Sequence, residues 1–171
     1  TEYADRLLEG LDSIDWSQRV AIAQREWIGK KSGVEVNHKV KDMDITLTAF
    51  SAYPAWLWAD TFLVVAPEHP LVDDLVRGTK YQKDVLRFVE KFKENKNNKG
   101  SKSDEKEGVF TGRYVVDSLT GREFPVWLAN FALMGFGTGI IRCSAHDPRD
   151  YDFANKYKIE TEEVVKRTDE G

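Results

Sequence analysis

The chain has 171 residues, of which 41% are apolar and 32% charged, and 25 basic against 29 acidic residues give a net charge of −4. This composition excludes a low-complexity disordered chain, and the acidic balance argues against a domain that holds a nucleic-acid duplex by charge alone. With a single Cys and no apolar run of the ~18 residues that a membrane span needs, we expect neither a disulfide nor a membrane partner. We therefore expect one cytoplasmic, monomeric domain over residues 1–171.

Two helices and then a strand are predicted in the first part of the chain. Apolar residues recur at helical spacing over residues 7–11 and 20–28. After the second helix the hydrophobic period changes to two, so that Val36, His38 and Val40 share one face. This alternation predicts a half-buried strand with a His on its apolar side.

The middle of the chain is predicted to contain two strands, a helical stretch and a loop. Strands over residues 45–50 and 62–66 flank an irregular segment, SAYPAWLWAD, at 51–60. Helical spacing returns in two steps over residues 71–92. Residues 95–107 include no apolar side chain, which predicts a mobile surface loop within the domain.

The last part of the chain predicts short strands and one capped helix. Short strands surround a turn at residues 118–121, and a further strand covers 140–144. Asp147 is a helix-capping residue, Pro148 suits the first helical position, and Asp150 favours the positive end of the helix dipole. Strands alternating with helices in this way predict an α+β domain with a small barrel-like sheet and peripheral helices.

The acidic corner before the last helix is the first candidate site. No phosphate loop, dinucleotide fingerprint, zinc-protease motif or nucleophile elbow occurs, so we expect no cofactor and no metal. Helix capping alone would explain Asp147 and Asp150. In the functional alternative, one carboxylate caps the helix and the other projects into a pocket, where it would bind an ammonium group such as the α-amine of an amino acid. His146 beside them is either a backbone-bonded residue or an acid–base group.

Cys143 and His38 are the second candidate pair. Cys143 shares a strand face with Ile141 and is either a small core residue or a nucleophile, and a nucleophile needs a base within hydrogen-bond reach. His38 interrupts a face otherwise made of Val, so it is either a hydrogen-bonded core residue or that base. Tyr53 and the two Trp residues at 56 and 58 are core or interface aromatics, or a stacking platform for a flat ligand.

Five long motifs follow one another in the chain, namely WIGKKSG (27–33), APEHPLV (66–72), KEGVFTG (106–112), SLTGREFPVWLANFALMGFGTG (118–139) and AHDPRDYDFANKY (145–157). In this order they closely resemble the editing domain inserted in leucyl-tRNA synthetases. The resemblance covers nearly the whole chain and implies a compact β-barrel-like core with peripheral helices.

The resemblance also implies an activity. Such domains hydrolyse the ester of tRNA charged with a wrong amino acid, by attack of water assisted by the terminal ribose, without a metal or a covalent nucleophile. Asp150 matches the Asp of the HDxRD motif that anchors the α-amine of the substrate, and Asp147 matches the first Asp of that motif. The implied partners are the acylated 3′ end of tRNA and the body of the parent synthetase.

The chain departs from the family pattern around the expected pocket. Where the family usually has TTRPDT, this chain has Ser51, Ala52, Tyr53, Pro54, Ala55 and Trp56. Trp56 replaces a Thr that sets the size of the pocket, and His38 replaces a Phe. These changes remove polar groups that would orient a ribose and a water molecule, so we hypothesise a pocket rebuilt by engineering or by divergence.

Three functions remain open from the sequence. The first is a hydrolase of small esters, in which a Cys143 thiolate attacks, His38 is the base, Ser51 bonds the oxyanion, and Asp60 is an alternative base or a partner of His38. The second is a divergent editing domain that acts through Asp150, and the third is a binding domain without catalysis. The predicted substrate-binding residues are Asp147, Ser51, Ala52, Tyr53, Trp56, Trp58, Asp60 and Ile141.

Overall fold

The computed structural model describes residues 3–30, 32–97 and 105–165, and its contacts form two compact units. The first unit, Thr1–Gly33, contains α1 (Ala4–Gly10) and α2 (Gln18–Ile28), the two helices expected there. Gly29 ends α2 in the left-handed conformation, with φ of 66°, which glycine adopts without steric cost.

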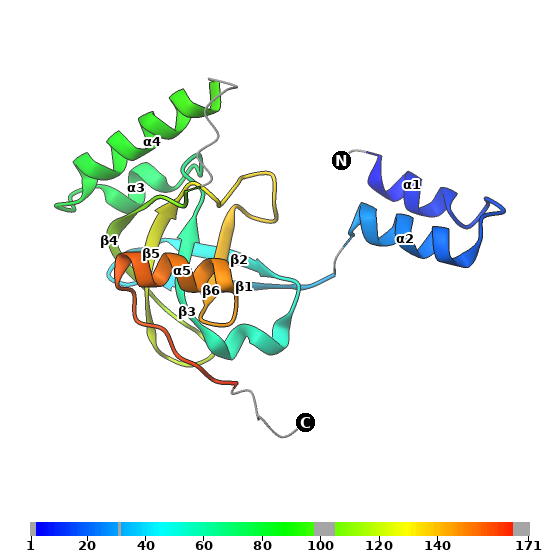
Figure 1. Ribbon diagram of the computed structural model, residues 1–171. Helices are drawn as coiled ribbons and strands as arrows, with labels where there is room; N and C mark the ends of the chain where they lie inside the picture. The colour runs from blue at the N-terminus through cyan, green and yellow to red at the C-terminus, as the bar shows by residue number, and fades with distance from the viewer. Residues whose placement is uncertain (1–2, 31, 98–104, 166–171) are drawn as a thin grey trace. The chain divides into compact units, whose positions relative to one another are not determined.

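The second unit, Val34–Gly171, contains the sheet and the remaining helices (Figure 1). Its strands are β1 (Val34–Val40), β2 (Thr46–Ser51), β3 (Asp60–Val65), β4 (Gly108–Val116), β5 (Glu123–Ala129) and β6 (Ile140–Ser144). Its helices are the short 3-10 helix η1 (Pro54–Ala59), α3 (Val72–Val76), α4 (Gln82–Asn97) and α5 (Pro148–Tyr157).

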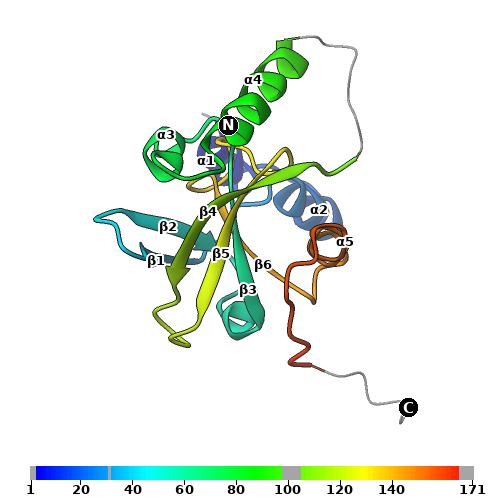
Figure 2. The ribbon, with the colours of Figure 1, turned by 90° about the vertical axis from the view of Figure 1, so that its left-hand side faces the viewer.

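The six strands form one curved sheet in the order β2-β1-β4-β5-β3-β6 (Figure 2). Neighbouring strands are antiparallel except β3 and β5, which run parallel. The two end strands, β2 and β6, also contact each other, so the sheet nearly closes into a barrel. The predicted α+β class with a barrel-like core and peripheral helices is confirmed.

The burial of β1 and β3 follows from their sequences. In β1, Val36, His38 and Val40 are buried and their neighbours are exposed, as the alternation predicts. In β3, side chains on both faces are buried, because Leu63 and Val65 lie in one apolar cluster and Phe62 and Val64 lie in another. A strand packed on both faces needs a continuous apolar run rather than an alternating one.

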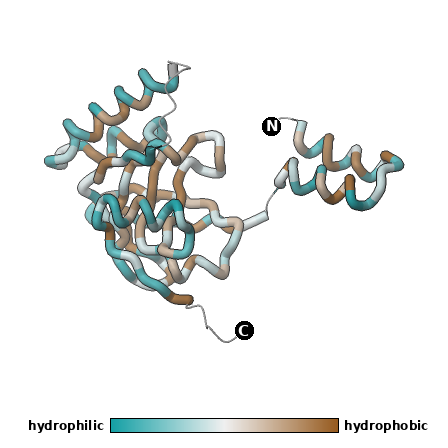
Figure 3. The backbone as a smooth tube through the Cα atoms, in the orientation of Figure 1, coloured by the Kyte–Doolittle hydropathy of each residue, from teal (hydrophilic) through white to brown (hydrophobic). Residues whose placement is uncertain are grey.

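The helices cover different parts of the barrel. Helices α3 and α4 pack on β4, and α5 packs on β6. Hydrophobic segments follow the strands, whereas α4 alternates between hydrophobic and hydrophilic residues (Figure 3). Helix α4 extends to Asn97, so the first residues of the loop expected over 95–107 are helical, and residues 98–104 lie outside the described part. No helix among the described residues has the length and apolar character required to span a bilayer.

Candidate functional site

The acidic corner joins β6 to α5, as the sequence predicts. The carboxylate of Asp147 caps α5 by accepting hydrogen bonds from the backbone N–H groups of Arg149 at 2.8 Å and Asp150 at 3.4 Å. The guanidinium of Arg149 also binds this carboxylate, with Nη2 3.0 Å from Oδ2. Hydrogen bonding from the Arg149 side chain lowers the pKa of Asp147, which therefore stays ionised.

Asp150 has the opposite electrostatic environment, although it lies only three residues away. Burial first, and then the nearby Asp147 carboxylate, raise the pKa of Asp150 to about 6. The thiol of Cys143 and the backbone N–H of Ser144 offset part of this increase in pKa. Within the described ranges, no Lys or Arg forms an ion pair with Asp150. Asp147 is therefore the capping carboxylate, and Asp150 is left without a cationic partner among the described residues.

Asp150 faces a cavity of about 490 Å³. Seven of the predicted site residues line this cavity together: Ser51, Tyr53, Trp56, Asp60, Ile141, Asp147 and Asp150. Its wall also includes His146, which the sequence interpretation considered beside the two Asp residues, and residues that it did not select, namely Phe50, Lys106, Phe131, Arg142, Ser144 and Arg149. The end of β2, η1, β6 and the start of α5 thus meet around one hollow, which we call the Asp150 cavity.

The aromatic residues of the segment at 51–60 differ in position. Tyr53 and Trp56 line the Asp150 cavity but remain 61% and 46% exposed, so they form its rim and leave the hollow open. The ring of Trp56 lies 5.5 Å from the ring of His146. Trp58 is 58% exposed and does not line the cavity, and neither does Ala52.

Cys143 is a buried side chain on the face of β6 that packs against α5. It lies in an apolar cluster with Phe62, Val64 and Phe153, and Ile141 packs on the same cluster. Burial first, and then the carboxylate of Asp150, raise the pKa of the thiol well above its usual value. Both effects oppose formation of the thiolate that nucleophilic attack requires.

His38 is buried inside the barrel and contacts arginine rather than cysteine. Its Nε2 lies 2.9 Å from Nη1 of Arg142, and its Nδ1 lies 3.7 Å from the carboxylate of Asp117. Burial first, and then the positive charge of Arg142, lower the pKa of His38 to about 4, so the ring is neutral at pH 7. A dyad of Cys143 and His38 would require both side chains to leave their present partners.

Arg142 is the residue that the sequence interpretation missed. Its Nε donates to Asp60 at 2.6 Å, its Nη1 to Asp117 at 2.8 Å, and its Nη2 to the carbonyl of Leu57 at 2.7 Å. Burial raises the pKa of Asp60, and Arg142 partly offsets this. Asp60 is therefore an ion-pair partner of Arg142, and the carboxylate next to His38 is that of Asp117. A lone Arg inside the apolar run IIRCS was the available signal, because a buried Arg requires acidic partners.

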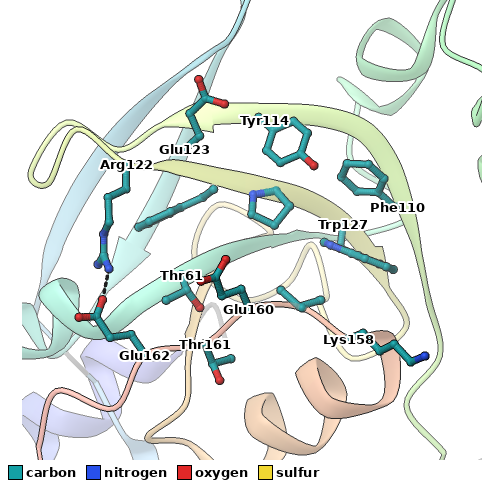
Figure 4. A pocket seen from close by; sticks show the side chains of 13 residues that line it. Thr61, Phe110, Tyr114, Arg122, Glu123, Trp127, Lys158, Glu160, Thr161 and Glu162 are labelled. Atoms are coloured by element: carbon teal, nitrogen blue, oxygen red, sulfur yellow. Dashed lines mark hydrogen bonds and ion pairs between the residues drawn. The ribbon is translucent and has the colours of Figure 1, made fainter.

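A second cavity, of about 510 Å³, lies on the outer side of β4 and β5 (Figure 4). Aromatic side chains including Phe110, Tyr114 and Trp127 form one wall, and residues 158–162 form the other. An ion pair between Arg122 and Glu162 crosses one end of it. None of the residues predicted from the sequence as site residues lines this second cavity.

Neither cavity contains the ligand set of a metal site. Across residues 3–30, 32–97 and 105–165, no group of three or more His, Cys, Asp or Glu side chains is arranged to hold an ion.

Comparison with known proteins assigns the chain to a family. The family model "Leucyl-tRNA synthetase, editing domain" matches residues 25–171. The leucine–tRNA ligase of Nitratidesulfovibrio vulgaris strain DP4 is 41% identical over 169 residues, 96% of this chain and 20% of that protein. The leucine–tRNA ligase of Thermotoga petrophila is 42% identical over 172 residues, 99% of this chain and 21% of that protein.

A solved structure supports the same family assignment. The ternary complex of Agrobacterium radiobacter K84 agnB2 LeuRS with tRNA and LeuAMS contains a matching region with a TM-score of 0.76 and 32% identity. The match covers 99% of this chain and 21% of that one, so the chain spans about a fifth of the length of its relatives. The chain therefore belongs to the editing-domain family of leucyl-tRNA synthetases.

Proposed function

We propose that this chain hydrolyses the ester bond between a wrongly attached amino acid and the 3′ end of tRNA. The observation that carries the proposal is the carboxylate of Asp150, which faces a cavity and has no ion-pair partner in the described part of the chain. A carboxylate in this position is stabilised by a cation, and the α-ammonium of an aminoacyl ester supplies one.

In this proposal the chain binds and orients the ester, and water is the nucleophile. At pH 7 most Asp150 side chains are ionised, because their pKa is about 6. The hydroxyl of Ser51 and the ammonium of Lys106 line the same cavity and provide hydrogen-bond donors for the ester or the ribose. The exposed rings of Tyr53 and Trp56 offer flat surfaces at the rim for the terminal base.

A covalent route through Cys143 has less support. The thiol is fully buried and keeps its proton, because burial and the nearby carboxylate of Asp150 raise its pKa. Attack on an ester would require a thiolate at the surface of the cavity, and Cys143 is not among the residues that line it. The substrate of the proposal is therefore the aminoacyl ester of tRNA rather than a small ester cleaved by a cysteine. The partner in the full-length protein would be the synthetase body.

Deacylation of leucine tRNA charged with isoleucine tests the proposal, with the protein in large excess over tRNA. We expect hydrolysis above the buffer rate. In Asp150→Ala, kcat/KM should decrease about 10- to 100-fold, which corresponds to the free energy of one charge-assisted hydrogen bond. Asp152→Ala is the matched control, because this exposed Asp lies on the same helix outside the Asp150 cavity. Hydrolysis at the buffer rate would refute the proposal and leave a binding domain without catalysis.

A further inference from the structure

The segment that carries Trp56 has little apolar packing of its own. It consists of η1 and the first residue of β3, and it joins the rim of the Asp150 cavity to the barrel. Within η1 only Leu57 and Ala59 are buried, so apolar packing holds two of its six residues. A 3-10 helix of this length has weak intrinsic stability, and its carbonyl groups need other partners.

Arg142 binds this segment from inside the barrel. Its Nη2 donates to the carbonyl of Leu57 at 2.7 Å, and its Nε donates to the carboxylate of Asp60 at 2.6 Å. Asp117 accepts from Nη1 at 2.8 Å and so fixes the guanidinium from the other side. The segment is therefore attached to β6 at both its middle and its end.

Arg122 binds the same segment from the side of the second cavity. Its Nη2 donates to the carbonyl of Trp58 at 3.1 Å and to that of Asp60 at 3.4 Å. The same guanidinium also forms an ion pair with Glu162, as Figure 4 shows. The ring of Phe124 is 5.8 Å from the guanidinium of Arg122 and 5.4 Å from that of Arg142, within the range of cation–π attraction.

The geometry points to Arg122 and Arg142 as a pair of positioning residues that fix residues 54–60 and thereby set the acyl size that the Asp150 cavity accepts. This inference rests on the proposed function. Three carbonyl groups within four residues accept from guanidinium groups, so the place of Trp56 in the cavity wall depends on both arginines. Because one methylene in an apolar pocket changes selectivity by about 10- to 200-fold, a small shift of this wall is measurable as selectivity.

The experiment uses Arg122, whose side chain is 37% exposed, because its loss perturbs the fold less than loss of the buried Arg142. Arg122→Met removes the donor, and Arg122→Lys restores a positive charge that reaches one carbonyl. Arg113→Met is a matched control, because Arg113 donates to the carbonyls of Leu75 at 2.8 Å and Arg77 at 2.9 Å, away from the Asp150 cavity. Glu162→Gln is a second control that removes the ion pair but keeps the carbonyl contacts.

Two readouts are expected to change in Arg122→Met and in neither control. Amide hydrogen exchange at residues 55–60, the part of the segment that carries amide hydrogens, should rise about tenfold or more, with no change in β1. The ratio of kcat/KM for alanyl- and isoleucyl-tRNA should change about 5- to 10-fold, mainly through KM, and Arg122→Lys should recover part of it.

Two outcomes would overturn the inference. One is unchanged exchange at residues 55–60 in Arg122→Met, and the other is an unchanged selectivity ratio in an otherwise active variant. If the unmodified chain does not hydrolyse either ester, the proposed function fails, whereas the exchange measurement still decides whether Arg122 positions the segment.

Discussion

The two faces of β6 place charged groups in opposite situations. On the inner face, Arg142 is enclosed by Asp60, Asp117 and His38, and every charge there has a partner within the barrel. On the outer side, the carboxylate of Asp150 lines a cavity and has no counter-ion in the described residues. Arg142 and Asp150 both line the Asp150 cavity.

This difference separates a structural role from a binding role. Buried ion pairs that are mutually satisfied hold the surrounding backbone in one arrangement, and their loss exposes an uncompensated charge. A carboxylate whose pKa is raised by burial destabilises the folded chain when it ionises, and a cationic ligand reverses that cost. The inner face therefore determines the shape of the cavity wall, and Asp150 provides the site for a charged ligand.

The largest effect is expected from Arg142→Met. This change leaves Asp60 and Asp117 buried without their counter-ion, so we expect the free energy of unfolding to fall by about 3–5 kcal/mol. Urea unfolding followed by circular dichroism measures this change. A loss below about 1 kcal/mol, the size expected of an exposed pair, would remove the distinction between the two faces.

A pH titration of stability tests the inner face without disturbing its packing. The pKa of His38 is about 4 in the folded chain and 6.5 in the unfolded one, so the unfolded state takes up a proton first as the pH falls. The contribution of His38 to stability is thus present above pH 6.5 and is lost as the pH approaches 4, by about 2 kcal/mol between pH 7 and pH 5. The free energy of unfolding of His38→Gln should lack this part of the pH dependence. Identical pH profiles for the variant and the unmodified chain would contradict a neutral buried ring.

The contribution of Asp150 to stability should change with pH in the opposite direction to that of His38, and Asp150→Asn tests this. Because its pKa is about 6 in the folded chain, above the ordinary 3.8, ionised Asp150 costs stability above pH 6 and this cost disappears as the pH falls below it. We expect the variant to be more stable by about 1–2 kcal/mol at pH 8, with little difference at pH 4. A thermal melt at both pH values checks the sign, and a destabilised variant at pH 8 would mean that Asp150 has a counter-ion.

The smallest effect is expected from the thiol beside Asp150. Cys143→Ala should leave the rate of ester hydrolysis within about twofold, because the thiol neither lines the cavity nor ionises at neutral pH. Iodoacetamide should alkylate Cys143 only after unfolding. Rapid alkylation of the folded chain, combined with loss of hydrolysis, would restore the cysteine route.

The sequence predicted those parts of the fold that depend on local pattern. The alternation in β1, the apolar run in β3 and the cap of α5 were read from neighbouring residues, and the structure confirms each of them. We expected the acidic corner to lie at a cavity because of the carboxylates of Asp147 and Asp150 and because of the family resemblance.

The inner network could not be predicted in the same way. Arg142 is 82 residues from Asp60 and 104 residues from His38 in sequence, and only the closure of the sheet brings the three together. The pairing of His38 with Cys143 was proposed on condition that their strands are neighbours, and β1 is not hydrogen-bonded to β6. Side chains alternate along β6, so Arg142 contacts His38 while the adjacent Cys143 faces the opposite side.

The most direct test of the account compares isoleucyl-tRNA carrying a free α-amine with the same ester after N-acetylation, at pH 7, where the carboxylate of Asp150 is mostly ionised and the α-amine is still largely protonated. If Asp150 binds the ammonium, acetylation should lower kcat/KM of the unmodified chain by about 10- to 100-fold and should have little effect in Asp150→Asn. Equal cleavage of both esters by the unmodified chain, or equal sensitivity in the variant, would contradict the assignment of Asp150.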